Sequence, residues 1–427
     1  MRAGREIGVV GGGWAGLAAA VEATQRGDRV TLFEMSRQLG GRARDLAING
    51  LGLDNGQHIC IGAYSATLRL LRALGVAEAD AFVRMPLRVD FADGAGLELR
   101  AGPPLLAFAG AVLRHPRWRP GDKLALLGAA ARWLAGGFDC DSALTVARLT
   151  ERLPSAIRAE LIDPLCVAAL NTPAGEASAA VFLRVLGDAL FSGRGSADLL
   201  LPRIGLGSLL PAPAGRWLGS AGATVRLGRR VEALTPAGDH WQVDGERYDA
   251  VVLAASAIES ARLARPFCPA WADTAAALRY EPIVTVYLRG AGAVLPAPML
   301  ALRCDSAAPA QFVFDRGRLG GPPGLLAFVI SGAQSWVDAG AAATLEAIRR
   351  QAESALADLL RAPLETVRLV TEKRATFRCT PNLRRPAMRI AARLYAAGDY
   401  VDGPYPSTLE GAVRSGVAAA LALVADR

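Results

Sequence analysis

Histidine and cysteine are scarce in this chain of 427 residues. It contains three histidines and six scattered cysteines, and no pair of cysteines forms a Cys-x-x-Cys motif. Zinc sites need closely spaced Cys and His ligands, and disulfide frameworks belong to short, cysteine-rich secreted chains. We therefore expect neither a metal centre nor a disulfide scaffold.

Long apolar runs are also missing. The two longest are residues 103–113 and 417–425, and both are well short of the roughly 18–20 residues that a membrane-spanning helix needs. The first expected strand begins at Ile7, which leaves no room for the apolar core of a signal peptide. We therefore expect a cytoplasmic protein without a transmembrane helix.

Lysine is nearly absent, so arginine carries the positive charge. The chain has 48 Lys+Arg against 40 Asp+Glu, which gives a net charge of +8. No basic run with interleaved aromatic residues occurs, and we expect no nucleic-acid partner. Hydrophobic residues make up 52% of the chain and charged residues 21%. This composition excludes a disordered protein, and the length favours two domains.

The strongest pattern lies at the start of the chain. Ile7–Val10 is typical of a buried parallel strand, and Gly11–Gly16 directly after it fits G-x-G-x-x-G. In this pattern Gly11 permits a tight turn and Gly13 lets the backbone approach a pyrophosphate. Gly16 lets the following helix pack closely on the strand. The order of strand, glycines and helix predicts a dinucleotide-binding fold.

The end of the second expected strand supports this prediction. Residues 30–33 are followed by Glu34, whose carboxylate can accept hydrogen bonds from ribose hydroxyls. Trp14 and Ala15 belong to the same glycine-rich loop and are predicted to contact the dinucleotide. The alternative is a glycine-rich turn in an unrelated α/β domain.

A second glycine-rich segment follows immediately. Arg37–Arg44 contains Gly40, Gly41 and Arg42 and is similar to the R-x-x-G-G-R segment of flavoproteins related to amine oxidases and phytoene desaturases. The paired glycines let backbone amides approach phosphates, and Arg42 supplies a fixed cation. The alternative interpretation is a basic surface turn.

A third segment near the C-terminus resembles the second fingerprint of such flavoproteins. An expected strand ends at Gly398 and Asp399, and residues 408–416 then enter a helix. Asp399 would bind the ribityl or pyrophosphate region, and the start of the helix would face the flavin ring. The positions at that helix start are Glu410, Gly411 and Ala412.

Residues 103–195 are predicted to be mostly helical. The apolar runs 103–113 and 123–134 flank a basic turn at residues 114–119. Such runs are typical of a contact with a membrane surface, and equally of a core helix pair joined by a solvated turn. Both interpretations stay open, and the first implies a peripheral position on the inner face of the cytoplasmic membrane. Elsewhere, a long helix is expected at residues 341–360, and strands at 224–227, 230–234, 248–254, 283–288, 311–315, 325–331 and 371–377.

These segments predict an α/β fold in which the cofactor domain is discontinuous. It is a Rossmann-like FAD-binding domain of the two-dinucleotide-binding type, with a second α+β substrate domain. In such flavoproteins the strand at the position of Val231 touches the adenine side through its backbone. The FAD-binding domain is expected to comprise residues 1–85, 196–268 and 385–427, and the substrate domain residues 86–195 and 269–384.

Taken together, the motifs resemble the squalene-associated branch of the amine oxidase and phytoene desaturase flavoprotein superfamily. The segments Asp54–His58 and Lys373–Phe377 carry the resemblance to this branch and to its hydroxysqualene dehydroxylases. The resemblance implies FADH2-dependent reduction of hydroxysqualene to squalene with loss of water, in squalene and hopanoid biosynthesis. The alternatives are a carotenoid-type desaturase or isomerase, and a prenyl-lipid-binding carrier of the same fold.

The resemblance leaves the proton donor open. Asp54 and His58 lie near the flavin in the family pattern, and Asp402 and Tyr405 follow the second fingerprint. Each has a structural alternative, such as an Asx-turn for Asp54 or packing between prolines for Tyr405. A C30 isoprenoid substrate predicts a long apolar tunnel with polarity confined to the flavin end. A separate reductase and direct reduction by NAD(P)H are both open as the electron source.

Overall fold

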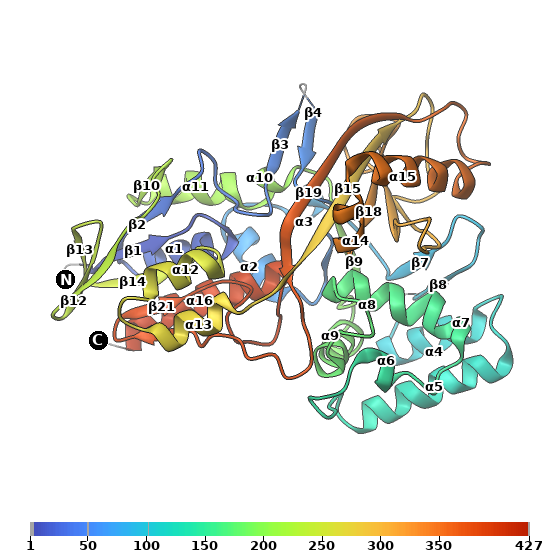
Figure 1. The fold of residues 1–427 in the computed structure, drawn as a ribbon, viewed down its shortest axis with the longest axis horizontal. Helices are drawn as coiled ribbons and strands as arrows, with labels where there is room; N and C mark the ends of the chain where they lie inside the picture. Colours follow the sequence, from blue (N-terminus) through green and yellow to red (C-terminus); the bar gives the residue numbers. More distant parts are fainter. Residues whose placement is uncertain (1–3, 49–50, 101, 426–427) are drawn as a thin grey trace.

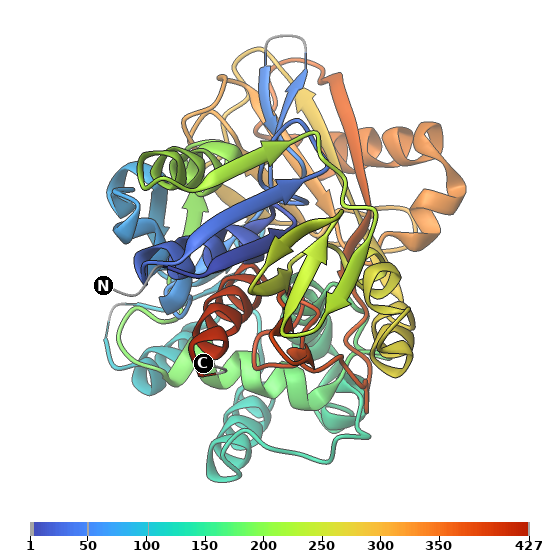
Figure 2. The ribbon, with the colours of Figure 1, turned by 90° about the vertical axis from the view of Figure 1, so that its left-hand side faces the viewer.

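The computed structural model describes residues 4–48, 51–100 and 102–425. Its first layer is a six-stranded sheet in the order β10-β2-β1-β14-β21-β20, in which the first five strands run parallel and β20 pairs antiparallel with β21. Segments from the start, middle and end of the chain therefore form one sheet (Figures 1 and 2). The strands are β1 (Glu6–Val10), β2 (Arg29–Glu34), β10 (Thr224–Leu227), β14 (Ala250–Leu253), β20 (Arg389–Ala391) and β21 (Leu394–Ala396).

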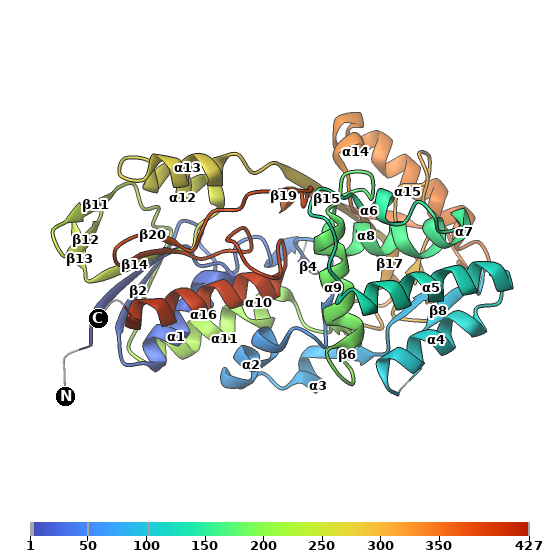
Figure 3. The same ribbon diagram turned by 90° about the horizontal axis from the view of Figure 1, so that it is seen from below.

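One face of this sheet is covered by the first and the last helix of the described chain. The alanine-rich α1 (Trp14–Gln25) lies directly against α16 (Leu409–Ala425), beside α11 (Pro211–Ser220) (Figure 3). A Cβ added to Gly416 would lie 2.1 Å from the carbonyl oxygen of Ala15. The two helices thus touch backbone to backbone, and the expectation that both ends of the chain build one unit is confirmed.

The opposite face is covered by a helix pair and a small meander. Trp241, Tyr248 and Trp271 form the aromatic part of the core on this side. The meander has the strand order β11-β12-β13. The elements are β11 (Leu234–Ala237), β12 (His240–Val243), β13 (Glu246–Tyr248), α12 (Ala257–Ala264) and α13 (Pro269–Ala276).

The second layer is a five-stranded antiparallel sheet in the order β16-β17-β18-β15-β19. Side chains alternate between its two faces, as the period of a strand requires. One face packs on α15 through Ile348 and Ala352, and the other packs against the hairpin β3–β4. The elements are β3 (Asp45–Ile48), β4 (Leu51–Asp54), β15 (Tyr280–Arg289), β16 (Met299–Ala301), β17 (Phe312–Asp315), β18 (Leu325–Ile330), α14 (Gln334–Ala339), α15 (Ala341–Ala355) and β19 (Glu365–Phe377).

The helical region forms its own core at the end of the molecule away from the six-stranded sheet (Figures 1 and 3). Phe108, Trp118, Leu126 and Phe182 lie in that core. The mostly helical character predicted for residues 103–195 is confirmed. Its elements are α4 (Pro104–Arg114), α5 (Pro120–Ala135), α6 (Val146–Leu149), α7 (Ser155–Ile157), the π-helical turn η1 (Arg158–Ile162), α8 (Asp163–Leu170) and α9 (Ala179–Phe191).

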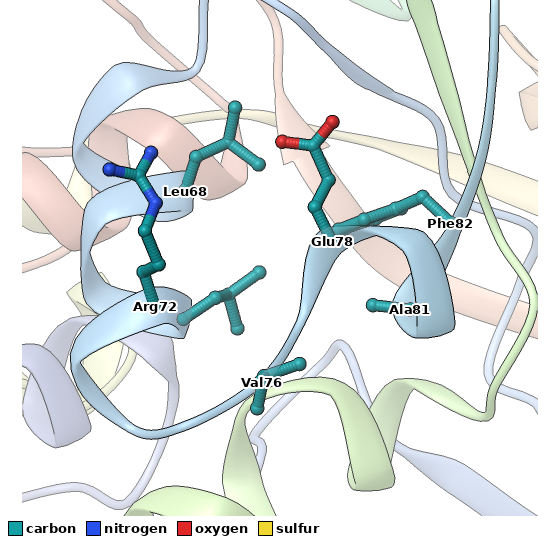
Figure 4. Close-up of a pocket in the computed structure, with 7 residues that line it drawn as sticks. Leu68, Arg72, Val76, Glu78, Ala81 and Phe82 are labelled. Atoms are coloured by element: carbon teal, nitrogen blue, oxygen red, sulfur yellow. The ribbon is translucent and has the colours of Figure 1, made fainter.

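Short elements connect the two layers. Two of them, α2 and α3, border a small hollow of about 150 Å³, where Leu68 and Arg72 face Glu78 and Phe82 (Figure 4). This hollow shares no lining residue with the large cavity described below. The elements are β5 (Cys60–Ile61), α2 (Ser65–Ala73), α3 (Glu78–Ala81), β6 (Phe82–Met85), β7 (Arg88–Asp90), β8 (Gly96–Glu98), β9 (Leu199–Pro202) and α10 (Leu206–Leu209). Within the described ranges, no helix is both long and apolar enough to cross a bilayer.

Two sequence predictions about elements are wrong. Residues 230–234 are not a strand, because the chain there runs beside α12 and forms no ladder until β11 begins at Leu234. The carbonyl of Val231 accepts instead from the Arg262 guanidinium, at 2.6 Å. The helix expected at 341–360 ends at Ala355, where the chain enters turns. The domain boundaries stay a prediction.

The buried carboxylate of Glu410 ties the last helix to α2. The residue is 0% exposed, and it accepts hydrogen bonds from the Ala66 N–H (2.9 Å), from the Thr67 N–H (2.9 Å) and hydroxyl (2.8 Å), and from Arg414 Nε (2.7 Å). An amide in its place has one acceptor oxygen and would leave buried donors unpaired.

We expect Glu410→Gln to lower the free energy of unfolding by about 2–4 kcal/mol. Chemical denaturation followed by circular dichroism measures this change. Glu353→Gln, at an exposed position of α15, is the control and should change stability by less than about 0.5 kcal/mol. Equal stability of the two variants would contradict the role assigned to Glu410.

Candidate active site

A cavity of about 690 Å³ lies between the two sheets. Glycine-rich loops at the carboxyl ends of β1 and β2 line one part of it, and the five-stranded sheet lines the other. Ligands of parallel α/β sheets bind at this edge. All but three of the predicted cofactor-binding residues line the cavity: Gly11, Gly13, Trp14, Ala15, Glu34, Gly40, Gly41, Arg42, Val231, Gly398, Asp399 and Ala412 do, whereas Gly16, Glu410 and Gly411 do not.

The first glycine-rich loop can turn tightly and pack closely because Gly11 and Gly16 carry no side chains. Gly11 has φ +113°, and a Cβ there would lie 2.5 Å from the Ala254 carbonyl oxygen. At Gly16 a Cβ would lie 1.8 Å from the carbonyl oxygen of Gly11. Gly16 therefore fixes the packing of α1 rather than touching the cavity, as its place in the motif predicts.

The second glycine-rich segment lies directly against the first. Gly40 donates its N–H to the carbonyl of Gly12 at 2.8 Å, and Gly13 and Gly40 form an isolated parallel bridge. A Cβ on Gly41, which has φ +61°, would lie 3.2 Å from the Cα of Gly13. Two stretches of bare backbone therefore border the same part of the cavity.

Glu34 is a buried carboxylate at the end of β2. Its Oε2 accepts from the N–H of Gly12 and its Oε1 from the N–H of Ser36, both at 2.7 Å. These bonds fix the carboxylate at the cavity wall and leave lone pairs on both oxygens, because each carboxylate oxygen can accept more than one hydrogen bond. The arrangement can bind a pair of hydroxyls.

Arg42 and Asp399 join the two distant motifs. Their side chains form an ion pair, and Arg42 Nη1 also donates to the carbonyl of Ala375 at 2.7 Å. Asn55 Nδ2 donates to the Arg42 carbonyl and to Glu372 Oε2, each at 2.9 Å. The guanidinium is thus held at one point of the cavity wall by groups from several segments.

Sequence reasoning missed a polar cluster at the far end of the glycine-rich part. Arg230 and Arg262 both bind Glu259, at 3.2 Å and 3.0 Å, beside Ser256 at the start of α12. All four residues line the cavity. The position of Ser256 could have indicated this cluster in the sequence. It follows β14 and so lies at the same carboxyl edge of the sheet as the glycine-rich loop.

His58 is the only one of the four proton-donor candidates that lines the cavity. Its Nδ1 lies 3.1 Å from the carbonyl oxygen of Gly56, which places a proton on Nδ1. Burial lowers the pKa of His58, and the charge of Arg42 acts in the same direction. The imidazole is therefore neutral near pH 7.

Asp54 lies behind the cavity wall. Its Oδ1 accepts from the Leu206 N–H at 2.9 Å, and its Oδ2 lies 3.6 Å from Arg316 Nη2. Burial raises the pKa of Asp54 to about 6, against the opposing charge of Arg316. The structure gives Asp54 a structural position at the start of α10.

Asp402 and Tyr405 also lie outside the cavity lining. The side chain of Asp402 is 72% exposed and bonds Arg385 Nη2 at 3.0 Å. The ring of Tyr405 packs edge-on against Tyr64 and beneath the guanidinium of Arg414. Neither residue therefore lies with His58 at the cavity.

The part of the cavity under the second sheet is largely apolar. Ile283, Phe312, Phe314, Val329 and Val370 line it, with Ala168 and Ala169 from α8. An apolar surface is therefore present, but polarity is not confined to the glycine-rich end as expected, since Thr285 and Ser331 line this part too.

Comparison with known proteins agrees with this arrangement. The family model for flavin-containing amine oxidoreductases matches residues 14–424. Hydroxysqualene dehydroxylase of Rhodopseudomonas palustris is 31% identical over 99% of both chains, and that of Zymomonas mobilis 27% identical over 96% of this chain and 97% of its own. The resemblance inferred from the motifs is confirmed.

Solved structures agree on the fold. Cyclohexylamine oxidase from Brevibacterium oxydans superposes with a TM-score of 0.72 at 16% identity, over 99% of both chains. With the matched family model and the full-length relatives, these findings establish the class of the protein. The chain belongs to the flavin-containing amine oxidoreductase family and is an FAD-dependent oxidoreductase.

Proposed function

We propose that this protein reduces hydroxysqualene to squalene with loss of water. The observation that carries the proposal is the continuity of one cavity, from a phosphate-compatible glycine cradle to an apolar sheet surface. The first part suits a dinucleotide and the second a hydrocarbon. The names of the full-length relatives supply the identity of the C30 substrate.

The residues present fit FAD, because Gly13 presents bare backbone to the cavity, where a Cβ would meet no atom nearer than the Cα of Gly41 at 3.9 Å. We place the pyrophosphate against Gly13, Gly41 and the start of α1, where a helix N-terminus favours anions. Glu34 would bind the adenosine ribose, with the adenine beside Val231. Asp399, oriented by Arg42, would bind the ribityl chain, and Ala412 at the start of α16 would lie near the flavin ring.

When bound and reduced, FAD supplies the hydride that replaces the hydroxyl group of the substrate. The chain must exclude water around the reacting carbon, hold the hydroxyl and deliver a proton to the departing oxygen. The apolar side chains under the second sheet exclude water. His58 is the proposed proton donor, because it alone of the four candidates borders the cavity. It would donate from Nε2 only as the imidazolium, because in the neutral ring the single proton stays on Nδ1 at the Gly56 carbonyl.

The substrate is dissolved in lipid, and we propose that α4 and α5 contact the membrane. Leu106 is 67% exposed and Leu124 68% exposed, with Leu105 and Leu113 also on the surface. Basic side chains surround them, and Asp122 is the single acid among residues 102–134. This combination is typical of binding to an anionic lipid surface. The electron donor is either a separate reductase or NAD(P)H itself.

Anaerobic mixing of the reduced enzyme with hydroxysqualene tests the reaction. We expect the flavin absorbance to return as squalene forms in equal amount, and no reoxidation with squalene as a control substrate. The absence of reoxidation would reject the dehydroxylase and favour the carotenoid-type alternative. A purified protein that cannot be loaded with FAD would favour the prenyl-lipid carrier.

Replacing the ribose-binding acid should weaken cofactor binding. We expect Glu34→Ala to raise the Kd for FAD about 5- to 150-fold, which corresponds to about 1–3 kcal/mol. Fluorescence titration of the apoprotein measures the change. The matched control is Glu22→Ala. Glu22 lies on the outer side of the same strand–helix–strand unit and forms an ion pair with Arg26. An unchanged affinity in Glu34→Ala would remove Glu34 from this role.

Charge placed on the exposed leucines should abolish membrane binding. We expect the double variant Leu106→Asp/Leu124→Asp to bind vesicles containing phosphatidylglycerol at least about tenfold more weakly, because a buried leucine contributes about 1.5–3 kcal/mol. Co-sedimentation measures binding. Leu421→Asp, which alters an exposed leucine on α16, should bind as the unchanged protein does. Equal binding by all three proteins would place the membrane contact elsewhere.

A further inference from the structure

Thr285 places a hydroxyl group among the apolar residues of the second sheet that line the cavity. Thr285 lies in the middle of β15 and pairs with Val329 on one side and Val370 on the other. Ile283, two residues away, lines the same cavity, since alternate residues of a strand share a face. A valine would fit this position as well as its neighbours do, so the threonine hydroxyl is the feature that needs an explanation.

The Thr285 hydroxyl has no partner within the described part of the chain. The residue is 1% exposed, and its Oγ1 is buried without a hydrogen bond. A buried unpaired polar group costs about 1–3 kcal/mol. An unmet hydrogen-bonding group on a cavity wall indicates a ligand that meets it.

A second unpaired group in the cavity lining belongs to Gln57. Arg316 Nη1 donates to Gln57 Oε1 at 3.0 Å, while Gln57 Nε2 is buried without a partner among the described residues. Because a guanidinium can only donate, it fixes the amide with its oxygen toward Arg316 and its NH2 group away from it. Arg316 is itself 4% exposed and held beside Asp54. The orientation of the Gln57 amide is therefore determined by the charge behind it.

Gly56, the chain neighbour of Gln57, lies close to both Thr285 and His58. A Cβ added there would lie 3.8 Å from Thr285 Oγ1 and 3.9 Å from Cε1 of His58. Gly56, Gln57, His58 and Thr285 all line the cavity. A hydroxyl that can accept or donate thus lies near the proposed proton donor, and an amide that can donate lines the same cavity.

We propose that Thr285 and Gln57 bind the hydroxyl group of the substrate and so decide which carbon of the hydrocarbon lies at the flavin. This inference rests on the proposed function and names its specificity residues. The Gln57 amide donates a hydrogen bond to the substrate oxygen. The Thr285 hydroxyl either accepts a hydrogen bond from the substrate O–H or donates one to the substrate oxygen. Squalene has no hydroxyl, so it would leave both groups unpaired, and sites of this kind discriminate against ligands that lack the polar group. The same pair therefore favours release of the product.

Ligand binding to the oxidised holoenzyme tests this pair without requiring turnover. Perturbation of the flavin spectrum gives the Kd for hydroxysqualene and for squalene in detergent micelles. We expect Thr285→Val to weaken hydroxysqualene binding roughly 3- to 10-fold and to leave squalene binding unchanged or tighter. Thr285→Ser keeps the hydroxyl and is the matched control, with the selectivity of the unchanged enzyme. Gln57→Leu should shift selectivity in the same direction as Thr285→Val.

A structural role would give a different result. If Thr285→Val weakens both ligands equally, or neither, the proposal is overturned, and thermal denaturation with flavin content confirms that each variant is folded. The test is separate from the test of the reaction. An enzyme that prefers hydroxysqualene through Thr285 and yet does not reduce it would retain this inference and lose the proposed function.

Discussion

The close approach of α16 to α1 is the constraint on which the site depends. Gly416 lies against the backbone of Ala15 with no space for a side chain, and the two helices begin at the same cavity. Trp14 and Ala15 line it from one helix start, and Leu409 and Ala412 from the other. Each helix N-terminus carries a partial positive charge of about half a unit. The packing of two small residues therefore directs two positive helix ends toward one anionic ligand.

The charged side chains of the cavity are arranged to complement those helix ends. Glu34 and Asp399 are both buried, and each is stabilised before any ligand binds, the first by two backbone N–H groups and the second by Arg42. Such bonds hold a carboxylate in one orientation and reduce the ordering that binding must supply. The ion pair of Arg42 and Asp399 also fixes the two distant motifs relative to each other, so that the site exists only in the folded chain.

Local pattern predicted the parts of this fold that local physics determines. The order of strand, glycines, helix and acid places Gly11, Gly16 and Glu34 in one strand–helix–strand unit of the sequence, and the structure has them after β1, in α1 and at the end of β2. The strand expected at residues 230–234 fails for the opposite reason. Its Val231 and Leu234 suit a ladder, but Arg262 satisfies the Val231 carbonyl from a distant helix. Sequence alone does not show such tertiary competition for a backbone group.

The positions of the site residues likewise depend partly on local pattern and partly on tertiary contacts. Asp54 and His58 are four positions apart, yet one caps α10 behind the wall and the other borders the cavity. That difference depends on the turn at Gly56, with φ +90°, and on a second sheet built from residues more than two hundred positions away. Thr285 carried no signal, because a threonine in a run of β-branched residues is ordinary for a strand. Its importance comes only from its neighbours and from its unpaired hydroxyl.

The energetics of a lipid-derived substrate explain why a few polar groups matter in a mostly apolar cavity. Burial from water contributes about 0.8 kcal/mol per CH2 group, but a hydrocarbon that arrives from a bilayer is already in an apolar medium. The sheet surface around Val329 and Val370 therefore selects by shape and contributes little net affinity. Each unpaired polar group on that surface disfavours every ligand that lacks a partner for it. Discrimination between the proposed C30 alcohol and its hydrocarbon product would consequently depend on the hydrogen-bonding groups of the wall, and the number of apolar contacts would have little influence on it.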